Sequence, residues 1–293
     1  MRFLDFLRRR PAAPQPASQP PRVGEGRLRF TGAMLSDPGR VRASNEDAVV
    51  FFAGEESELD AFDLVAAVAD GMGGHAAGEV ASALALATLR KVLKEARAGP
   101  PQALADALSE ANRAIRAHAR DHPETEGMGT TCTAALVRGD ALWIGHIGDS
   151  RAYLLRDGVL TQLSEDHTLR AQLLRDGAIS EAEGASTAGL LLRALGAAEE
   201  IEPMLSTSGL ALRSDDRLLL CSDGLHGVVT DNEMRAALQA DDPQLACEAL
   251  VKAAIAAGGP DNVSVGVFRF HEETEPASSA PTRPVGLPAA SAE

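Results

Sequence analysis

Short apolar runs with turn-rich flanks recur along the middle of the chain. They are rich in Val, Ile, Leu, Phe and Thr, and Gly, Asp or Pro residues stand beside them, which is typical of β-strands. This pattern predicts strands over residues 27–35, 47–52, 63–70, 131–137, 141–149, 151–155, 216–223 and 263–270.

Longer stretches rich in Ala and Leu interrupt these runs. Their apolar residues recur at three- and four-residue spacing, which predicts helices over 75–98, 101–121, 232–240 and 243–258. Two helices follow three strands, then come more strands and more helices, so strict strand–helix alternation is absent. The order favours a layered α+β sandwich over a doubly wound parallel sheet.

Both ends of the chain differ from the block at 24–271. Residues 1–23 combine a basic, apolar decapeptide with a Pro-rich stretch that reads as an extended linker, and 272–293 read as a disordered tail. The decapeptide is either a short amphipathic helix in weak contact with a membrane or a partner, or a frayed terminus. We expect one compact domain between these ends.

Charge and composition exclude several classes of protein. The 293 residues carry 28 Lys plus Arg against 42 Asp plus Glu, a net charge of −14, which argues against nucleic acid as a partner. No apolar run approaches the ~20 residues that span a bilayer. Cys132, Cys221 and Cys247 are odd in number and widely spaced, so we expect small buried residues in a reducing, cytoplasmic setting.

Acidic residues gather at the ends of the predicted strands. Asp70, Asp149 and Asp223 end apolar runs, Asp261 lies in a GGPDN turn, and Glu46 precedes Asp47 at the start of a run. One such Asp alone is commonly only a turn residue. Several carboxylates brought together would repel one another unless a cation lay between them, and oxygen ligands favour Mg²⁺ or Mn²⁺ over Zn²⁺.

Seven segments together resemble the bacterial branch of the metal-dependent protein serine/threonine phosphatases, the PPM or 2C class. In order they are GRVRASNED (39–47), DGMGGHAAGEVAS (70–82), MGTTC (128–132), GHIGDSRAYLL (145–155), SEDHTL (164–169), CSDGL (221–225) and GGPDNVSV (258–265). The resemblance implies a four-layer α-β-β-α sandwich, in which two antiparallel sheets are flanked by helices and hold a dinuclear metal site between them.

The resemblance also implies a role for each acidic position. Asp70 would bridge two metal ions, and the carbonyl of Gly71 would bind the first. Asp223 and Asp261 would hold the second. Two further roles are implied: Glu46 and Asp47 near the metals, largely through water, with Asp47 the closer, and Asp149 with Asp223 at a third, weaker site.

The chemistry implied is hydrolysis of a phosphomonoester by direct attack of a metal-bridging hydroxide. Arg42 matches the family's phosphate-binding arginine, since a guanidinium can hold two phosphate oxygens. His75 is either the acid that protonates the leaving oxygen or only a residue near the substrate. Residues 170–196 correspond to a mobile flap, and the EAEGASTAGL segment within it departs from the family pattern.

We therefore expect a metal-dependent protein serine/threonine phosphatase, a phosphoric monoester hydrolase that uses Mn²⁺ or Mg²⁺. Its substrates would be phosphorylated proteins, including a Ser/Thr kinase and the targets of that kinase, and the family implies a monomer. The alternative is a non-catalytic, regulatory phosphoprotein-binding module on the same fold. Degenerate members of that kind usually lose metal carboxylates, which this chain keeps.

Overall fold

The computed structural model describes residues 28–53, 61–73, 77–180, 183–184 and 190–272. The predicted terminal segments at 1–23 and 272–293, and His75, lie outside the described residues, except that Glu272 ends a strand and so does not belong to the predicted tail.

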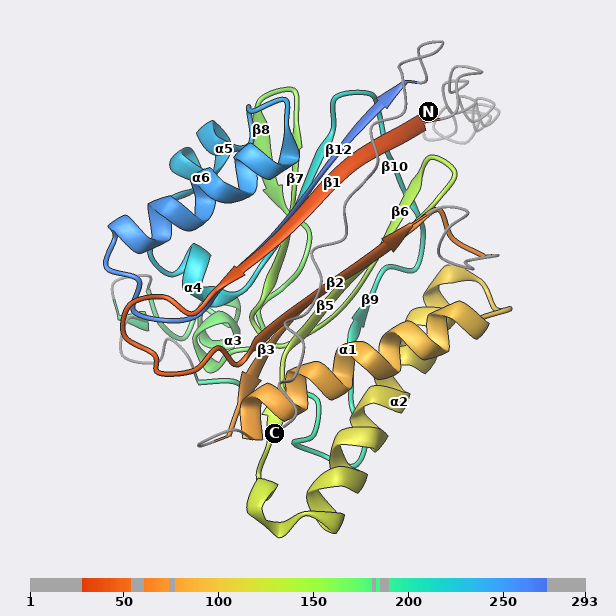
Figure 1. The fold of residues 1–293 in the computed structure, drawn as a ribbon, viewed down its shortest axis with the longest axis vertical. Coiled ribbons are helices and arrows are strands. Elements are labelled where there is room, and N and C mark those ends of the chain that lie inside the picture. Colours follow the sequence, from red (N-terminus) through yellow and green to blue (C-terminus); the bar gives the residue numbers. More distant parts are fainter. Residues whose placement is uncertain (1–27, 54–60, 74–76, 181–182, 185–189, 273–293) are drawn as a thin grey trace, which may run out of the picture.

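Two antiparallel sheets form the centre of the molecule (Figure 1). The first has the order β1 (Leu28–Asp37), β12 (Val263–Glu272), β11 (Arg217–Cys221), β7 (Arg151–Arg156) and β8 (Val159–Gln162). The second has the order β10 (Leu210–Ala211), β6 (Ala141–Ile147), β5 (Cys132–Arg138), β3 (Leu64–Met72) and β2 (Asp47–Ala53), with β4 (Gly129–Thr130) paired to β3 and β9 (Met204–Leu205) paired to β6.

Helices cover the outer face of each sheet (Figure 1). The long hairpin of α1 (Ala77–Glu95) and α2 (Pro100–Asp121) packs on the second sheet, and a short turn, η2 (Pro123–Thr125), follows it. The first sheet carries α4 (Asp223–His226), α5 (Asp231–Ala237) and α6 (Pro243–Ala256), while α3 (Leu169–Arg175) lies in the predicted flap. The predicted α-β-β-α sandwich is confirmed. No helix in the described ranges is long and apolar enough to cross a bilayer.

All eight predicted strands and four predicted helices are present, with ends shifted by a few residues. The hydrophobic pattern does not predict β4, β8, β9, β10, α3 or α4. These elements are two to seven residues long, and β8 and α3 contain no buried residue, so they leave no apolar period to detect.

Three apolar cores hold the layers together. The inner core fills the space between the sheets, with Phe51 and Phe268 edge to face at 5.6 Å. The second core lies under α1 and α2 and contains Cys132, and the third lies under α4–α6 and contains Cys221 and Cys247. All three thiols are free and buried, as predicted, and burial raises the pKa of each to about 12.

Candidate metal and phosphate site

The site begins where β2 starts and β3 ends. These strands pair antiparallel with Asp47 directly opposite Asp70. Directly paired residues point to the same face of a sheet, so the register alone places these two carboxylates side by side. Asp47 and Asp70, which are 23 positions apart in the sequence, therefore point toward the same site.

Asp70 has a rigidly held backbone. Its N–H donates to Thr131 Oγ1 at 2.9 Å, and its carbonyl accepts from the Thr131 N–H at 2.9 Å and from Thr130 Oγ1 at 2.8 Å. Both backbone groups are thus satisfied at the point where the strand ends. The carboxylate is left free to face its neighbours.

Gly71 must be glycine because the chain is crowded there. A Cβ at this position would collide with the carbonyls of Gly78 and Glu46. The Gly71 N–H donates to the Glu46 carbonyl at 3.1 Å, and that carbonyl also accepts from Ser82 Oγ at 2.6 Å. The first turn of α1, which carries Gly78 and Ser82, therefore packs tightly on the segment before β2.

The remaining carboxylates come from loops of the first sheet and from the turn that joins β6 of the second sheet to β7 of the first. Asp223 opens α4, and the preceding Ser222 donates from Oγ to Asp47 Oδ2 at 2.7 Å. Asp149 follows β6, and its carbonyl lies 2.9 Å from His226 Nε2. Asp261 lies in the turn before β12.

Burial shifts the pKa values of these carboxyl groups upward and is the largest cause for each of the five that shift, Glu46 included. Neighbouring carboxylates add to the shift. The pKa of Asp47 rises to about 6 and that of Asp149 to about 7, while those of Asp70 and Asp223 also rise. Five acidic groups whose pKa values are raised in this way are candidates for function.

The donor set fits a hard divalent cation. Asp47 Oδ1 is buried and has no hydrogen-bond partner among the described residues, so an oxygen ligand is available at the centre of the cluster. Carboxylate oxygens are the ligands that Mg²⁺ and Mn²⁺ prefer. Among the described residues, no group of three or more His, Cys, Asp or Glu side chains has a geometry that could hold a metal ion. The carboxylates nevertheless lie close enough to raise one another's pKa values.

Arg42 lies at the edge of the acidic cluster. Its Nη2 donates to Asp261 Oδ2 at 2.7 Å, and its side chain is 51% exposed. The hydrogen bond and the charge of Asp261 raise the pKa of Arg42, with smaller contributions from Glu46 and Asp70. The guanidinium is therefore accessible to an incoming anion while remaining beside the carboxylates.

The structure brings together all the predicted site residues that it describes, which are Arg42, Glu46, Asp47, Asp70, Gly71, Asp149, Asp223 and Asp261. Their roles as ligands stay predictions. His167, in the SEDHTL segment, ties that segment to the end of β6: its Nδ1 accepts from the Gly148 N–H at 3.2 Å.

Sequence reasoning overlooked the side chains that hold the carboxylates in place. Thr131 fixes Asp70, Ser222 binds Asp47, and His226 meets the carbonyl of Asp149. Ser222 could have been identified from the sequence, because it directly precedes the predicted site residue Asp223. Nothing in the local sequence connects Thr131 to Asp70, 61 residues away, because strand pairing creates that contact.

Comparison with known proteins places these features in a family. A family profile described as protein phosphatase 2C matches residues 40–253. A serine/threonine protein phosphatase PstP from Mycobacterium tuberculosis is 45% identical over 238 residues, which cover 80% of this chain. A serine/threonine phosphatase stp from Listeria monocytogenes is 37% identical over 238 residues, covering 78% of this chain and 92% of its own length.

Solved structures agree with the family match. The catalytic domain of PstP in complex with two manganese ions superposes with a TM-score of 0.73 at 43% identity, covering 84% of this chain and all of that one. The chain spans only 44% of the length of the M. tuberculosis PstP sequence that it matches.

Proposed function

The chain belongs to the protein phosphatase 2C family, and from this premise we propose that it hydrolyses phosphoserine and phosphothreonine in proteins. The observation that carries the proposal is the cluster of buried, mutually repelling carboxylates beside an exposed arginine. Relatives of this chain are named as serine/threonine phosphatases, and we infer the same activity for this chain.

We assign two divalent cations, Mn²⁺ or Mg²⁺, to this cluster. Asp70 and the Gly71 carbonyl would hold the first, and Asp70, Asp223 and Asp261 the second, with Asp47 and Glu46 acting largely through water and Asp149 serving a third, weaker ion. When bound, such ions lower the pKa of water and neutralise phosphate oxygens. The two manganese ions in the PstP crystal structure support this assignment.

Arg42 would bind and orient the phosphate group. Its planar guanidinium can donate two parallel hydrogen bonds to phosphate oxygens, which fixes the direction of the scissile bond. In the free protein this group is paired with Asp261, so the phosphate competes with a carboxylate for it.

Water, rather than a protein side chain, would attack the phosphorus. Ser150 is fully buried, and its Oγ is 2.6 Å from Thr131 Oγ1, so it is no nucleophile. The three cysteines are buried as well. His75 stays predicted either as the acid that protonates the leaving seryl or threonyl oxygen or only as a residue near the substrate, since it lies outside the described ranges.

The physiological substrates would be a Ser/Thr kinase and the proteins that it phosphorylates. The names of the bacterial relatives support phosphorylated Ser and Thr as the target. A monomeric state, a cytoplasmic location and the contact through residues 1–10 stay predictions.

Phosphate release from a phosphothreonine peptide, with and without Mn²⁺, tests the proposal. We expect Mn²⁺-dependent turnover in the wild type, near-complete loss in Asp223→Asn, and normal turnover in Asp231→Asn, a matched exposed carboxylate on α5. Folded, Mn²⁺-treated wild type without turnover would favour the phosphoprotein-binding alternative. A burst of covalently bound phosphate would rule out direct attack by water.

A further inference from the structure

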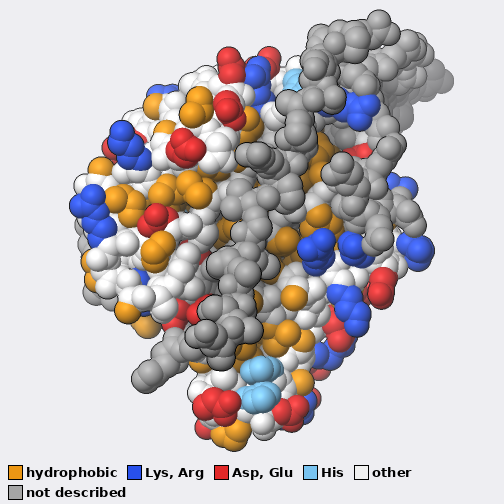
Figure 2. All heavy atoms as spheres, viewed as in Figure 1, with side chains coloured by type: hydrophobic (Ala, Val, Ile, Leu, Met, Phe, Trp, Pro, Cys, Tyr) orange, Lys and Arg blue, Asp and Glu red, His pale blue; other side chains and the backbone are white. Residues whose placement is uncertain are grey.

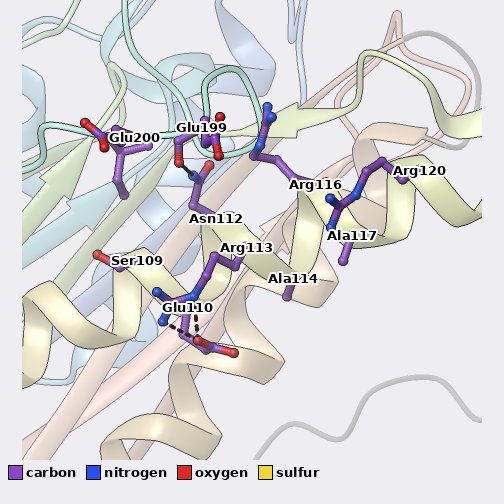
Figure 3. Close-up of a pocket in the computed structure, with 11 residues that line it drawn as sticks. Ser109, Glu110, Asn112, Arg113, Ala114, Arg116, Ala117, Arg120, Glu199 and Glu200 are labelled. Atoms are coloured by element: carbon purple, nitrogen blue, oxygen red, sulfur yellow. Dashed lines mark hydrogen bonds and ion pairs between the residues drawn. The ribbon is translucent and has the colours of Figure 1, made fainter.

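Two adjoining hollows of about 690 and 500 Å³ lie on the exposed face of α2, and Figure 3 shows the larger one. Their walls carry four Lys or Arg side chains against five Asp or Glu. Figure 2 shows acidic and basic side chains side by side over the hairpin of α1 and α2. Opposite charges in nearly equal number favour no class of ligand at these hollows. A more specific arrangement of polar groups surrounds Asn262.

The loop at 38–46 connects β1 to β2 and carries Arg42 and Glu46 of the candidate site. It forms neither helix nor strand, and the side chain of Arg42 is exposed. A loop of this kind has no ladder of hydrogen bonds to fix its shape, so its backbone groups need partners elsewhere in the molecule. In Figure 1 the loop runs beside the turn at 258–262, which leads into β12. The position of the guanidinium therefore depends on how that turn holds the loop.

The side chain of Asn262 makes three hydrogen bonds to the backbone of this loop. Its Oδ1 accepts from the Glu46 N–H at 2.8 Å, and its Nδ2 donates to the carbonyls of Pro38 and Ser44 at 2.9 Å each. Asn262 is buried, and both of its amide protons are used. The three bonded groups lie at the start and the end of the loop, so one side chain fixes both ends of the segment that carries Arg42.

The backbone around Asn262 is constrained as well. The Asn262 N–H donates to Asp261 Oδ1 at 2.9 Å, which leaves Oδ2 to accept from Arg42 Nη2 at 2.7 Å. A Cβ at Gly39 would collide with the Asp261 carbonyl. A Cβ at Gly224 would collide with the Asn262 carbonyl, so the loop, the turn and α4 pack in direct contact. Asn262 thus holds the loop of Arg42 with its side chain, and it holds the carboxylate that pairs with Arg42 with its backbone.

We propose that Asn262 is a positioning residue, which holds the loop at 38–46 so that Arg42 can bind the phosphate group of the substrate. The proposal rests on the proposed phosphatase function and adds to it a residue whose amide is occupied by the loop rather than by a ligand. Arg42 reaches the phosphate, so Asn262 acts through that guanidinium. A small displacement of a group that orients a substrate lowers binding and turnover steeply. Without the Asn262 amide, the loop would keep Arg42 but lose its direction.

The test compares Asn262→Ala with a matched control, Asn112→Ala. Asn112 is also buried and holds another loop by the same three kinds of hydrogen bond, accepting from the Gly196 N–H and donating to the carbonyls of Ala198 and Glu199. With Mn²⁺ and p-nitrophenyl phosphate, we expect Asn262→Ala to raise KM about tenfold and to lower kcat by less than about threefold. The dissociation constant of inorganic phosphate, measured by calorimetry, should rise by the same factor. Asn112→Ala should leave both constants unchanged.

A double-mutant cycle with Arg42→Ala tests whether Asn262 acts through that arginine. In the Arg42→Ala background, Asn262→Ala should change the phosphate affinity by less than about twofold. A further loss of about tenfold there would overturn the proposal, as would an equal loss in Asn112→Ala. A fall in Mn²⁺ affinity as large as the fall in phosphate affinity would also overturn it, because the effect would then run through Asp261.

A second variant covers the case in which Asn262→Ala does not fold. Asn262→Asp keeps the volume of the side chain and an acceptor for the Glu46 N–H, but it removes both donors. Any effect of its added charge would persist in the Arg42→Ala background, whereas an effect of positioning would not. Wild type that binds phosphate without hydrolysing p-nitrophenyl phosphate would contradict the phosphatase function alone, and the phosphate affinities would still decide the role of Asn262. Wild type that binds no phosphate would overturn both.

Discussion

The molecule contains two kinds of largely buried carboxylate. Asp47 and Asp149 belong to the acidic cluster, whereas Asp166 and Asp216 each form an ion pair with an arginine. Arg156 donates from Nε and Nη2 to the two carboxylate oxygens of Asp216 at 2.8 and 2.6 Å. Arg151 makes the same bidentate contact with Asp166, donating from Nε and Nη2 to its two carboxylate oxygens at 2.8 and 2.6 Å. In the acidic cluster, Asp47 instead keeps an oxygen atom without a partner.

The pKa of Asp166 shifts in the opposite direction to the pKa values of the clustered carboxylates. Burial raises the pKa of Asp166, but its hydrogen bonds to Arg151 and the charge of that arginine outweigh burial, so the pKa falls below its usual value. In the acidic cluster, burial and like charges both raise the pKa. Paired carboxylates contribute to the stability of the fold, whereas the clustered ones cost stability until a cation binds.

The largest expected effect is on catalysis. Asp70→Asn should lower kcat/KM for a phosphothreonine peptide about 1,000-fold, because cation-assisted charge stabilisation is worth about 4 kcal/mol. The same substitution should raise the melting temperature of the metal-free protein, since it removes repulsion from Asp47 and Asp223. Steady-state kinetics and thermal unfolding in chelator measure both. A destabilised metal-free variant would mean that Asp70 has a structural role.

For the arginine-paired carboxylates, we expect substitution to lower the stability of the fold without lowering catalytic activity. Asp216, whose side chain is 1% exposed, also accepts from the Arg213 N–H. Asp216→Ala should cost about 3 kcal/mol in the free energy of unfolding, because it leaves a partly buried arginine unpaired. Urea unfolding measures this cost, and kcat per folded molecule should stay normal. A large fall in kcat would contradict the separation of the two groups.

Cation binding should stabilise the protein through the acidic cluster alone. At a Mn²⁺ concentration 100 times the dissociation constant, the free energy of unfolding should rise by about 2.7 kcal/mol. Asp216→Asn should keep this rise and Asp70→Asn should lose it, as followed by calorimetry with and without chelator. A rise retained in Asp70→Asn would place the cation elsewhere.

The smallest effect concerns pH and a buried histidine beside the paired group. Burial lowers the pKa of His146 to about 4, and the nearby His167 adds to the shift. The unfolded chain, with a pKa near 6.5, binds a proton first as pH falls, so stability drops below about pH 6.5 and continues to fall toward pH 4.

At pH 5.5 this group should cost about 1.2 kcal/mol relative to pH 7. His146→Gln should reduce the difference in unfolding free energy between these two pH values by that amount. His122→Gln, an exposed control, should leave the difference unchanged. An unaltered pH dependence in His146→Gln would mean that His146 is protonated in the folded state.

Most of the fold could be predicted from local sequence, because the period and the length of an apolar pattern are enough to identify a long helix or strand. The runs that became β3 and β12 are almost wholly buried, and α2 shows one apolar face, so their patterns are strong. The site carboxylates were also predictable, since each lies at the end of such a run. The pairing of Asp47 with Asp70 and the hydrogen bond from the Gly196 N–H to Asn112 Oδ1 were not predictable, because both are contacts between segments distant in sequence.

The reactivity of the three buried thiols reports on local opening of each outer helical layer of the sandwich. A thiol reagent cannot reach Cys132 unless the layer of α1 and α2 lifts, and it cannot reach Cys221 or Cys247 unless the layer of α4–α6 does. Modification rates at these positions therefore record how often each side of the molecule exposes its interior, and mass spectrometry of the labelled peptides separates the two without any introduced probe.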